Sequence, residues 1–382
     1  MATKPKKEVE RAKAGLEGVV AADTAISHVD GQGGKLIYHG YSIQDLAEHA
    51  SFAEVAYLLW YGRLPGALEF DAFLDSFTGS LDLPIETVMI LRMFPKAATP
   101  MEVLRTGVSS LGHWDPDSGV TRRDAVLRKA NRLTTRIPML ITAHQRMRNG
   151  KEPIHPVPGR SISYNFFYTL TGQEPDPLSV EALDVALTLH ADHGFNASTF
   201  AARVTAATMS DMYSSVVSGI GALKGPLHGG ANEAVMVMLE EIGEAKRAEK
   251  YILDKLEAKE KIPGFGHRVY KVEDPRAKVL KKYADKLCKH FGDDRYLAIS
   301  QVVEKVMTAK TKVRPNVDFY SATVYHVMGI PTELFTPIFV MSRVVGWTAH
   351  ILEQWANNRL IRPMSNYVGP IGLKYVSLDK RV

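Results

Sequence analysis

Apolar residues recur at spacings of three and four along most of this chain, which is the period of amphipathic helices. Local capping signals mark where several of these helices begin. Ser51 followed by Glu54 predicts a capping box, and Gly62 is placed to end the same helix. The segment 99–102, with a threonine, a first-turn proline and a glutamate, predicts a second helix start.

Longer periodic stretches predict the helices that build most of the fold. We expect them over 121–148, 275–291, 294–310 and from about 332 past 353. Strand signals are few and fall at 35–38 and 374–378. No internal repeat of solenoid period and no low-complexity segment interrupts the pattern. The sequence therefore predicts an almost entirely α-helical protein.

Shifts in composition along the chain suggest two domains. Residues 197–223 are rich in Ala, Ser, Thr and Gly, small side chains that let helices pack closely, either in a buried pair or at a subunit contact. From about 240 to 312 the chain is charged and rich in lysine, and it becomes apolar again after Gly329. We predict a charged N-terminal arm (1–14), a large helical domain (15–228 and 330–382) and a small helical domain (229–329) inserted into it.

Composition also limits the compartment and the partners. The net charge is +5 over 382 residues, and no basic stripe with interleaved aromatics indicates nucleic-acid binding. Cys288 is the only cysteine, which excludes an intrachain disulfide and a thiolate metal cage and is compatible with a reducing cytoplasm. No apolar run reaches ~18 residues, and the charged start reads as neither a signal nor a transit peptide. We expect a cytoplasmic protein with no membrane or nucleic-acid partner.

Three short segments place an acid or a base beside residues that shape the backbone. His228 lies in LHGGAN, His267 in PGFGH and Asp318 in PNVD. The glycines allow the main chain to approach a ligand closely. Two histidines and one carboxylate are a sufficient set for proton transfer on a carbon acid. No HExxH motif, carboxylate cluster, GxSxG elbow or phosphate loop indicates a metal site or another catalytic class.

The order of these segments, together with four others, resembles the citrate synthase family over about 15–370 of the chain. The further segments are GLEGVVAADTAISHVDGQGGKLIYHGYSIQDLA, LHADHGFNASTF, IFVMSRVVGWTAHILEQ and RLIRPMSNYVGP. They resemble, in turn, the family's N-terminal hairpin and first helix, its oxaloacetate-histidine region and its two C-terminal arginine segments. The length resembles the shorter prokaryotic form. The resemblance implies a two-domain, all-α acyltransferase whose small domain closes over the site.

By this resemblance the protein would condense acetyl-CoA with oxaloacetate and hydrolyse citryl-CoA to citrate and CoA. Asp318 would remove a methyl proton while His228 donates to the thioester oxygen, and His267 would donate to the ketone of oxaloacetate. Because His228 precedes a predicted helix, the helix dipole favours its neutral form. The same dipole would keep Asp318 ionised yet weaken it as a base.

The resemblance also implies binding residues. Those for oxaloacetate are His193, Asn196, Arg276, Phe339, Arg343 and Arg362. Arg362 would reach the site of the neighbouring subunit, which implies a homodimer. For CoA, the backbone of Pro263, Gly264, Phe265 and Gly266 would line the adenine pocket, and Lys310, Lys312 and Arg314 would meet the phosphates. The CoA thioester is then a substrate, and we expect neither a cofactor nor a metal.

Two alternative functions stay open. 2-Methylcitrate synthase uses propionyl-CoA with the same residues, and the extra methylene is worth roughly 1–3 kcal/mol of discrimination. An inactive helical scaffold protein is the alternative of another class, although every motif residue is present. Where the family usually reads YRGY this chain has His39, which puts a structural contact of that arginine in doubt. We expect the remaining histidines to be core or surface residues: His28, His49, His113, His144, His155, His290, His326 and His350.

Overall fold

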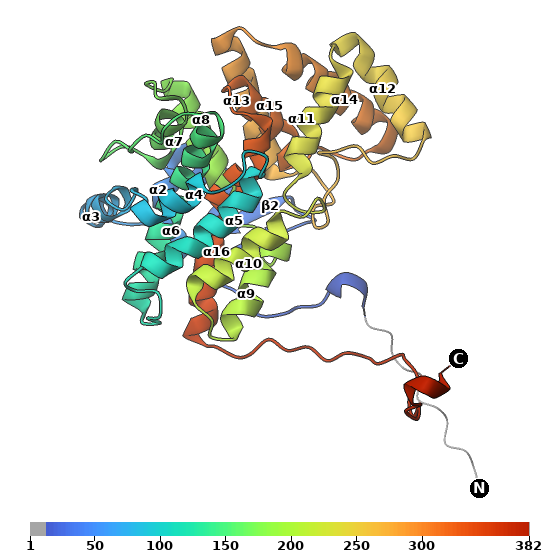
Figure 1. Cartoon of the computed structure of the whole chain (residues 1–382). Coiled ribbons are helices and arrows are strands. Elements are labelled where there is room, and N and C mark those ends of the chain that lie inside the picture. Colours follow the sequence, from blue (N-terminus) through green and yellow to red (C-terminus); the bar gives the residue numbers. More distant parts are fainter. Residues whose placement is uncertain (1–12, 382) are drawn as a thin grey trace.

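The computed structural model describes residues 13–381, so most of the predicted arm (1–14) lies outside the described residues. The fold is 61% helical, with 16 α-helices and one small three-stranded sheet in the described part. The predicted all-α fold class is confirmed. Figure 1 shows a large helical body with a second group of helices on one side of it.

The large body combines ten helices from the first three-fifths of the chain with one long helix near its end. They are α1 (Ile43–His49), α2 (Phe52–Tyr61), α3 (Ala67–Thr78), α4 (Ile85–Arg92), α5 (Pro100–Leu111), α6 (Arg123–Arg148), α7 (Ile162–Thr171), α8 (Pro177–His190), α9 (Ala197–Ala207), α10 (Met212–Leu223) and α16 (Phe335–Ala356). The antiparallel sheet has the order β1 (Ser27–Asp30), β2 (Lys35–Tyr38) and β3 (Tyr41–Ser42). Four 3₁₀ helices complete the described elements: η1 (Ala14–Leu16), η2 (Gly112–Trp114), η3 (Thr332–Leu334) and η4 (Leu378–Lys380).

Helix α16 forms the centre of this body. Every residue from Phe335 to Leu352 is buried, and the helix packs against α2, α5, α6, α8, α9 and α10. By length and composition the segment Thr332–Ala356 could cross a membrane, although Arg343 interrupts its apolar run. The whole of its apolar window is buried inside the fold. Packing in the core therefore accounts for its apolar character.

The second group of helices consists of α11 (Ala231–Ile242), α12 (Ala245–Glu257), α13 (Pro275–Phe291), α14 (Arg295–Thr311) and α15 (Val317–Val327). Within it, α12 packs on α14, and both α11 and α13 pack on α15. Helix α13 also contacts α1 and α8, and α11 contacts α16. The boundaries predicted at 228/229 and 329/330 fall in the loops that flank this group, and the division into two domains stays a prediction.

The capping signals read from the sequence are confirmed. Ser51 and Glu54 form the capping box of α2, and Gly62 ends that helix with φ 78°. The carboxylate of Glu102 accepts the Thr99 N–H at 3.0 Å at the start of α5. The four long helices are also present, as α6, α13, α14 and η3 followed by α16.

One predicted strand is confirmed and one is wrong. The segment 35–38 is β2, paired on both edges by β1 and β3. The segment 374–378 is exposed irregular chain that ends in a 3₁₀ turn, and no described strand pairs with it. An alternating apolar pattern forms a strand only where another strand completes its hydrogen bonds.

After α16 the chain leaves the helical body, as Figure 1 shows. Residues 358–381 are almost entirely exposed. Apolar side chains share this exposure: Leu360 is 56%, Met364 93%, Val368 90% and Ile371 87% exposed. Nothing in the described chain covers this tail, which includes Arg362.

Candidate active site

The turn between α8 and α9 carries two of the predicted residues. His193 is 8% exposed, and Asn196 is the N-cap of α9, where its side chain accepts the Thr199 N–H at 3.2 Å. Asp192, which is fully buried, accepts the Gly194 N–H at 3.0 Å. Hydrogen bonds on both sides of His193 therefore fix the shape of the turn.

His267 faces His193 from the loop before α13, with 5.1 Å between the ring centroids. Its Nδ1 accepts the backbone N–H groups of Val269 at 3.0 Å and Tyr270 at 3.1 Å. Because both partners are donors, Nδ1 is unprotonated and the ring proton lies on Nε2. Burial and the nearby Arg276 lower the pKa of His267 to about 4. Near neutral pH the ring is therefore uncharged and has one N–H, at Nε2, to offer a ligand.

Arg276 lies in the first turn of α13 and is 3% exposed. Asp274, the N-cap of α13, accepts its Nε–H at 3.0 Å and an Nη2–H at 2.8 Å. Although burial alone would raise the pKa of Asp274, the Arg276 guanidinium lowers it below its usual range. The pair fixes the plane of the guanidinium and leaves its Nη1 donors free of this carboxylate for an anion.

Arg343 projects from the middle of α16 and is 1% exposed. Its Nε–H donates to the His190 carbonyl at 2.7 Å, and the guanidinium lies over the Phe339 ring, 4.7 Å from its centroid. No carboxylate of the described residues lies within 4.0 Å of it. Burial lowers the pKa of Arg343 to about 10, so it stays charged at neutral pH. A buried cation without a carboxylate in direct contact is costly, and this one is therefore placed to receive an anion.

His228 lies just before α11, and its Nε2 is 2.7 Å from the hydroxyl oxygen of Ser198. The same hydroxyl accepts the indole N–H of Trp347 at 3.2 Å and lies 2.8 Å from Asn196 Oδ1. Its one proton goes either to Asn196 or to His228, so the tautomer of His228 depends on that choice. Burial and the charge of Arg343 lower the pKa of His228 to about 4. The predicted neutral state of this histidine agrees with its surroundings, and burial is the larger cause.

Asp318 is the second residue of α15, and its N–H donates to the side chain of the N-cap, Asn316, at 3.0 Å. Its Oδ1 is buried without a hydrogen-bond partner. Burial raises the pKa of Asp318 to about 6, against the lowering effect of Arg276. The weakening expected from the helix dipole is therefore outweighed by burial, which makes this carboxylate a stronger base than an ordinary aspartate.

The turn 263–266 is joined to the start of α15 by backbone hydrogen bonds. The Gly266 N–H donates to the Arg314 carbonyl at 3.2 Å, and the Asn316 N–H donates to the Gly264 carbonyl at 2.9 Å. Gly264 has φ +78°, and a Cβ there would lie 2.8 Å from the Phe319 ring. Only glycine fits this position. The predicted CoA segment and the loop that carries Asp318 thus form one unit.

A cavity of about 250 Å³ opens beside this unit. Of the predicted residues, His267, Gly266, Lys312 and Arg314 line it. Lys310, Pro263, Gly264 and Phe265 do not line it, although Lys310 directly precedes the lining residue Thr311 at the end of α14. A much larger cavity, about 940 Å³, lies between α1, α3, α8 and Tyr283, and none of the predicted site residues lines it.

A further predicted residue is not brought to this site. Arg362 lies in the exposed tail beyond α16, outside the helical body that holds the other residues. The described residues hold no group of three or more His, Cys, Asp or Glu side chains that could bind a metal.

Comparison with known proteins identifies this arrangement. The family model described as citrate synthase, C-terminal domain, matches residues 15–364. The chain belongs to the citrate synthase family. It is therefore an enzyme of the acyltransferase type, and the resemblance read from its motifs is confirmed.

Relatives within the family carry two names. The chain is 50% identical over 368 residues to citrate synthase 2 of Bacillus subtilis, covering 96% of this chain and 98% of that protein. It is 43% identical over 369 residues to the 2-methylcitrate synthase of Shewanella oneidensis, covering 96% and 98%. The solved citrate synthase of Thermoplasma acidophilum, in ternary complex with carboxymethyl coenzyme A and oxaloacetate, is 32% identical with a TM-score of 0.91, covering 98% of this chain and all of that one.

Several site residues were missed by sequence reasoning. Asp274 orients Arg276, Tyr270 contacts both His193 and His267, and Ser198 contacts His228. The spacing DPR, with Asp274 two residues before Arg276 at a helix start, was a local signal for the first of these. The others join segments far apart in the chain, and no local pattern identifies them.

Proposed function

We propose that this protein condenses acetyl-CoA with oxaloacetate and hydrolyses citryl-CoA to citrate and CoA. The observation that carries the proposal is the burial of Arg343 without a carboxylate partner. Arg276 lies in the same region and keeps free donors on its guanidinium. Two buried arginines suit a dianion with two carboxylates, which is what oxaloacetate is.

In this mechanism the ketone of oxaloacetate lies against His267. The Nε2–H of its neutral ring donates to the ketone oxygen, and His193 contacts the same region through Tyr270. A donor aimed at the oxygen that becomes negative lowers the barrier to attack on the ketone carbon. Phe339, which packs on Arg343, closes the apolar side of the oxaloacetate pocket.

The acyl substrate is activated by Asp318 and His228. Asp318 removes a proton from the methyl group of acetyl-CoA, and His228 donates to the thioester oxygen as the enol forms. This role requires the Ser198 hydroxyl to donate to His228 Nε2, so that the His228 proton lies on Nδ1. The enol carbon then bonds to the ketone carbon while the enol O–H returns its proton to His228. The ketone oxygen takes the proton from His267, and the proton held by Asp318 restores His267 through solvent. Water finally cleaves the citryl thioester, and CoA leaves as a thiol.

The CoA moiety is proposed to lie along the cavity beside the 263–266 turn. Lys312 and Arg314 line that cavity and would meet the phosphates, with Lys310 further along α14. The turn backbone would hold the adenine. The thioester is the substrate, and the proposed reaction needs neither a resident cofactor nor a metal.

The active unit is proposed to be a cytoplasmic homodimer in which Arg362 completes the partner's site. The exposed apolar side chains of the tail and its departure from the body support this assignment. The single buried Cys288 suits a reducing compartment.

The decisive experiment measures thiol release from acetyl-CoA and from propionyl-CoA, each with oxaloacetate. A higher kcat/KM for acetyl-CoA supports citrate synthesis. A higher value for propionyl-CoA would establish 2-methylcitrate synthase, the second candidate, which the Shewanella oneidensis relative favours. If neither thioester releases a thiol, the proposed activity is contradicted and the inactive scaffold protein is the reading that remains.

A further inference from the structure

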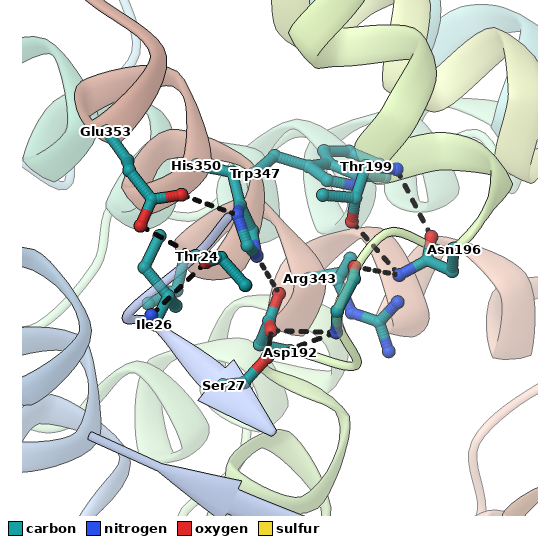
Figure 2. Close-up of polar contacts among 12 residues, drawn as sticks. Thr24, Ile26, Ser27, Asp192, Asn196, Thr199, Arg343, Trp347, His350 and Glu353 are labelled. Atoms are coloured by element: carbon teal, nitrogen blue, oxygen red, sulfur yellow. Dashed lines mark hydrogen bonds and ion pairs between the residues drawn. The ribbon is translucent and has the colours of Figure 1, made fainter. Parts of the chain in front are cut away.

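One face of α16 supports three parts of the site. Arg343, Trp347 and His350 are spaced by four and three residues, so they lie on one side of the helix. Arg343 faces the proposed oxaloacetate site, and Trp347 donates to Ser198, the partner of His228. His350 has no role in the mechanism, and Figure 2 shows it pointing at Asp192.

Asp192 determines the shape of the turn that presents His193. Its Oδ2 accepts the Gly194 N–H at 3.0 Å and the hydroxyl of Ser27, and its Oδ1 lies 3.1 Å from His350 Nε2. The hydroxyl of Tyr38 bonds both the N–H and the carbonyl of Asp192, at 3.0 and 2.8 Å. Asp192 therefore links the turn to β1, β2 and α16.

His350 lies between two carboxylates. Both His350 and Asp192 have no exposed surface, and Nδ1 of His350 faces Glu353 at 3.7 Å. Although burial opposes the charged form, the Asp192 and Glu353 carboxylates raise the pKa of His350. Among the other charged groups nearby, Arg203 of α9 bonds Glu353 at 2.9 Å.

Glu353 extends the chain of contacts to the N-terminal segment. It accepts the Thr24 hydroxyl at 3.1 Å and the Ala25 N–H at 2.9 Å, in addition to Arg203. Burial alone would raise the pKa of Glu353. His350, together with the Ala25 N–H and the Thr24 hydroxyl, instead lowers it to about 2. A continuous series of polar contacts thus runs from segment 24–27 through α16 to the turn.

We propose that His350 is a positioning residue for oxaloacetate: through Asp192 it fixes the turn that presents His193 and Asn196. Without it, the Asp192 carboxylate loses the hydrogen-bond partner that α16 supplies at Oδ1, while the bonds from Arg343 to the His190 carbonyl and from Gly346 to the Ala191 carbonyl remain. The buried carboxylate could then rotate away from Gly194, which would displace His193. This inference rests on the proposed function, because it concerns the same oxaloacetate site.

The test compares His350→Leu, which removes the donor, with His350→Gln, which restores an N–H toward Asp192. For His350→Leu we expect the KM for oxaloacetate to rise about 10- to 100-fold, since a displacement of about 1 Å can cost roughly 100-fold. The KM for acetyl-CoA at saturating oxaloacetate should change by less than about twofold, because the loss concerns oxaloacetate alone. His350→Gln should recover most of the oxaloacetate affinity.

Asp184→Asn is a matched control. Asp184 accepts a backbone N–H, from Phe52 at 2.8 Å, and a serine hydroxyl, from Ser163 at 2.9 Å, much as Asp192 does. It lies on α8 away from the site, so its replacement should alter stability without changing either KM. An equal rise in the oxaloacetate KM for Asp184→Asn would reduce the effect of His350 to general destabilisation and overturn the proposal.

Two further outcomes decide the matter. Suppose that the wild type is active and that the His350→Leu variant folds. If the variant then has the same KM for oxaloacetate as the wild type, the inference fails and the proposed function stands. If His350→Leu does not fold, Asp192→Asn carries the test, and an unchanged oxaloacetate KM in that variant overturns the inference. A wild-type protein without thiol release contradicts the proposed function first, and the inference falls with it.

Discussion

Replacing Asp318 with asparagine should abolish condensation and at the same time stabilise the fold. The substitution keeps the size of the side chain and removes the charge. Loss of a general base typically costs about 10²–10⁴-fold in rate. Oxaloacetate binding should be nearly unchanged, because the arginines and His267 are untouched.

The stability change follows from the raised pKa of Asp318. A rise from 3.8 to about 6 corresponds to about 3 kcal/mol as an upper bound, at 1.36 kcal/mol per unit. The stabilisation that this carboxyl contributes when protonated is fully present below pH 3.8 and is lost as the pH rises through about 6. The stability advantage of Asp318→Asn over the wild type should therefore grow between about pH 4 and 6 and be constant above that range.

Two measurements check this reasoning. Thiol release measured against pH should show a wild-type kcat/KM that rises with an apparent pKa near 6, as the free base ionises. Urea unfolding at several pH values between 4 and 8 gives the stability difference between the wild type and the variant. Wild-type turnover in Asp318→Asn would remove this residue from the mechanism. A stability difference that does not depend on pH would contradict the burial argument.

Three other predictions test the surrounding structure. A Cβ at Gly31 would overlap the carbonyl oxygen of Val269, whose N–H bonds His267. Gly31→Ala should therefore raise the KM for oxaloacetate. Gly119→Ala is the control and should leave that KM unchanged, because open space surrounds Gly119. Arg343→Lys should raise the same KM roughly tenfold, because hydrogen bonds to charged groups contribute about 1.5–3 kcal/mol and lysine cannot make the paired contact; an unchanged KM would remove it from the substrate site. Mixing subunits with Arg362→Ala and subunits with Asp318→Asn should restore part of the activity, and no recovery despite heterodimer formation would mean that each subunit uses its own arginine.

The features that sequence predicted best are those determined by neighbours in the chain. Ser51 and Glu54 cap α2 because the capping box needs only residues three apart. The strand expected at 374–378 failed because a strand depends on a partner that local sequence does not contain. β1 and β3 are short and polar, and only the resemblance to a known hairpin indicated them.

The candidate residues were found from motifs, but apart from the neutral state of His228 their chemical states were not. The proton of His267 is placed by two backbone N–H groups of the loop that follows it. The basicity of Asp318 comes from burial, which outweighs the helix dipole that the sequence suggested. His350 was expected to be an ordinary core or surface histidine, and it is buried, but its partner Asp192 is 158 residues away.

The site concentrates several costs to stability in one place. Arg343 is buried without a carboxylate in direct contact, and burial raises the pKa of Asp318 well above its usual value. Each of these states is unfavourable in the free protein and favourable once a substrate supplies the missing charge or proton. The surrounding contacts hold them there: Asp274 fixes Arg276, and α16, buried along most of its length, holds Arg343. Binding of a dianion should therefore stabilise the folded protein by more than its own hydrogen bonds would suggest, because it also removes the cost of burying Arg343 without a carboxylate in contact.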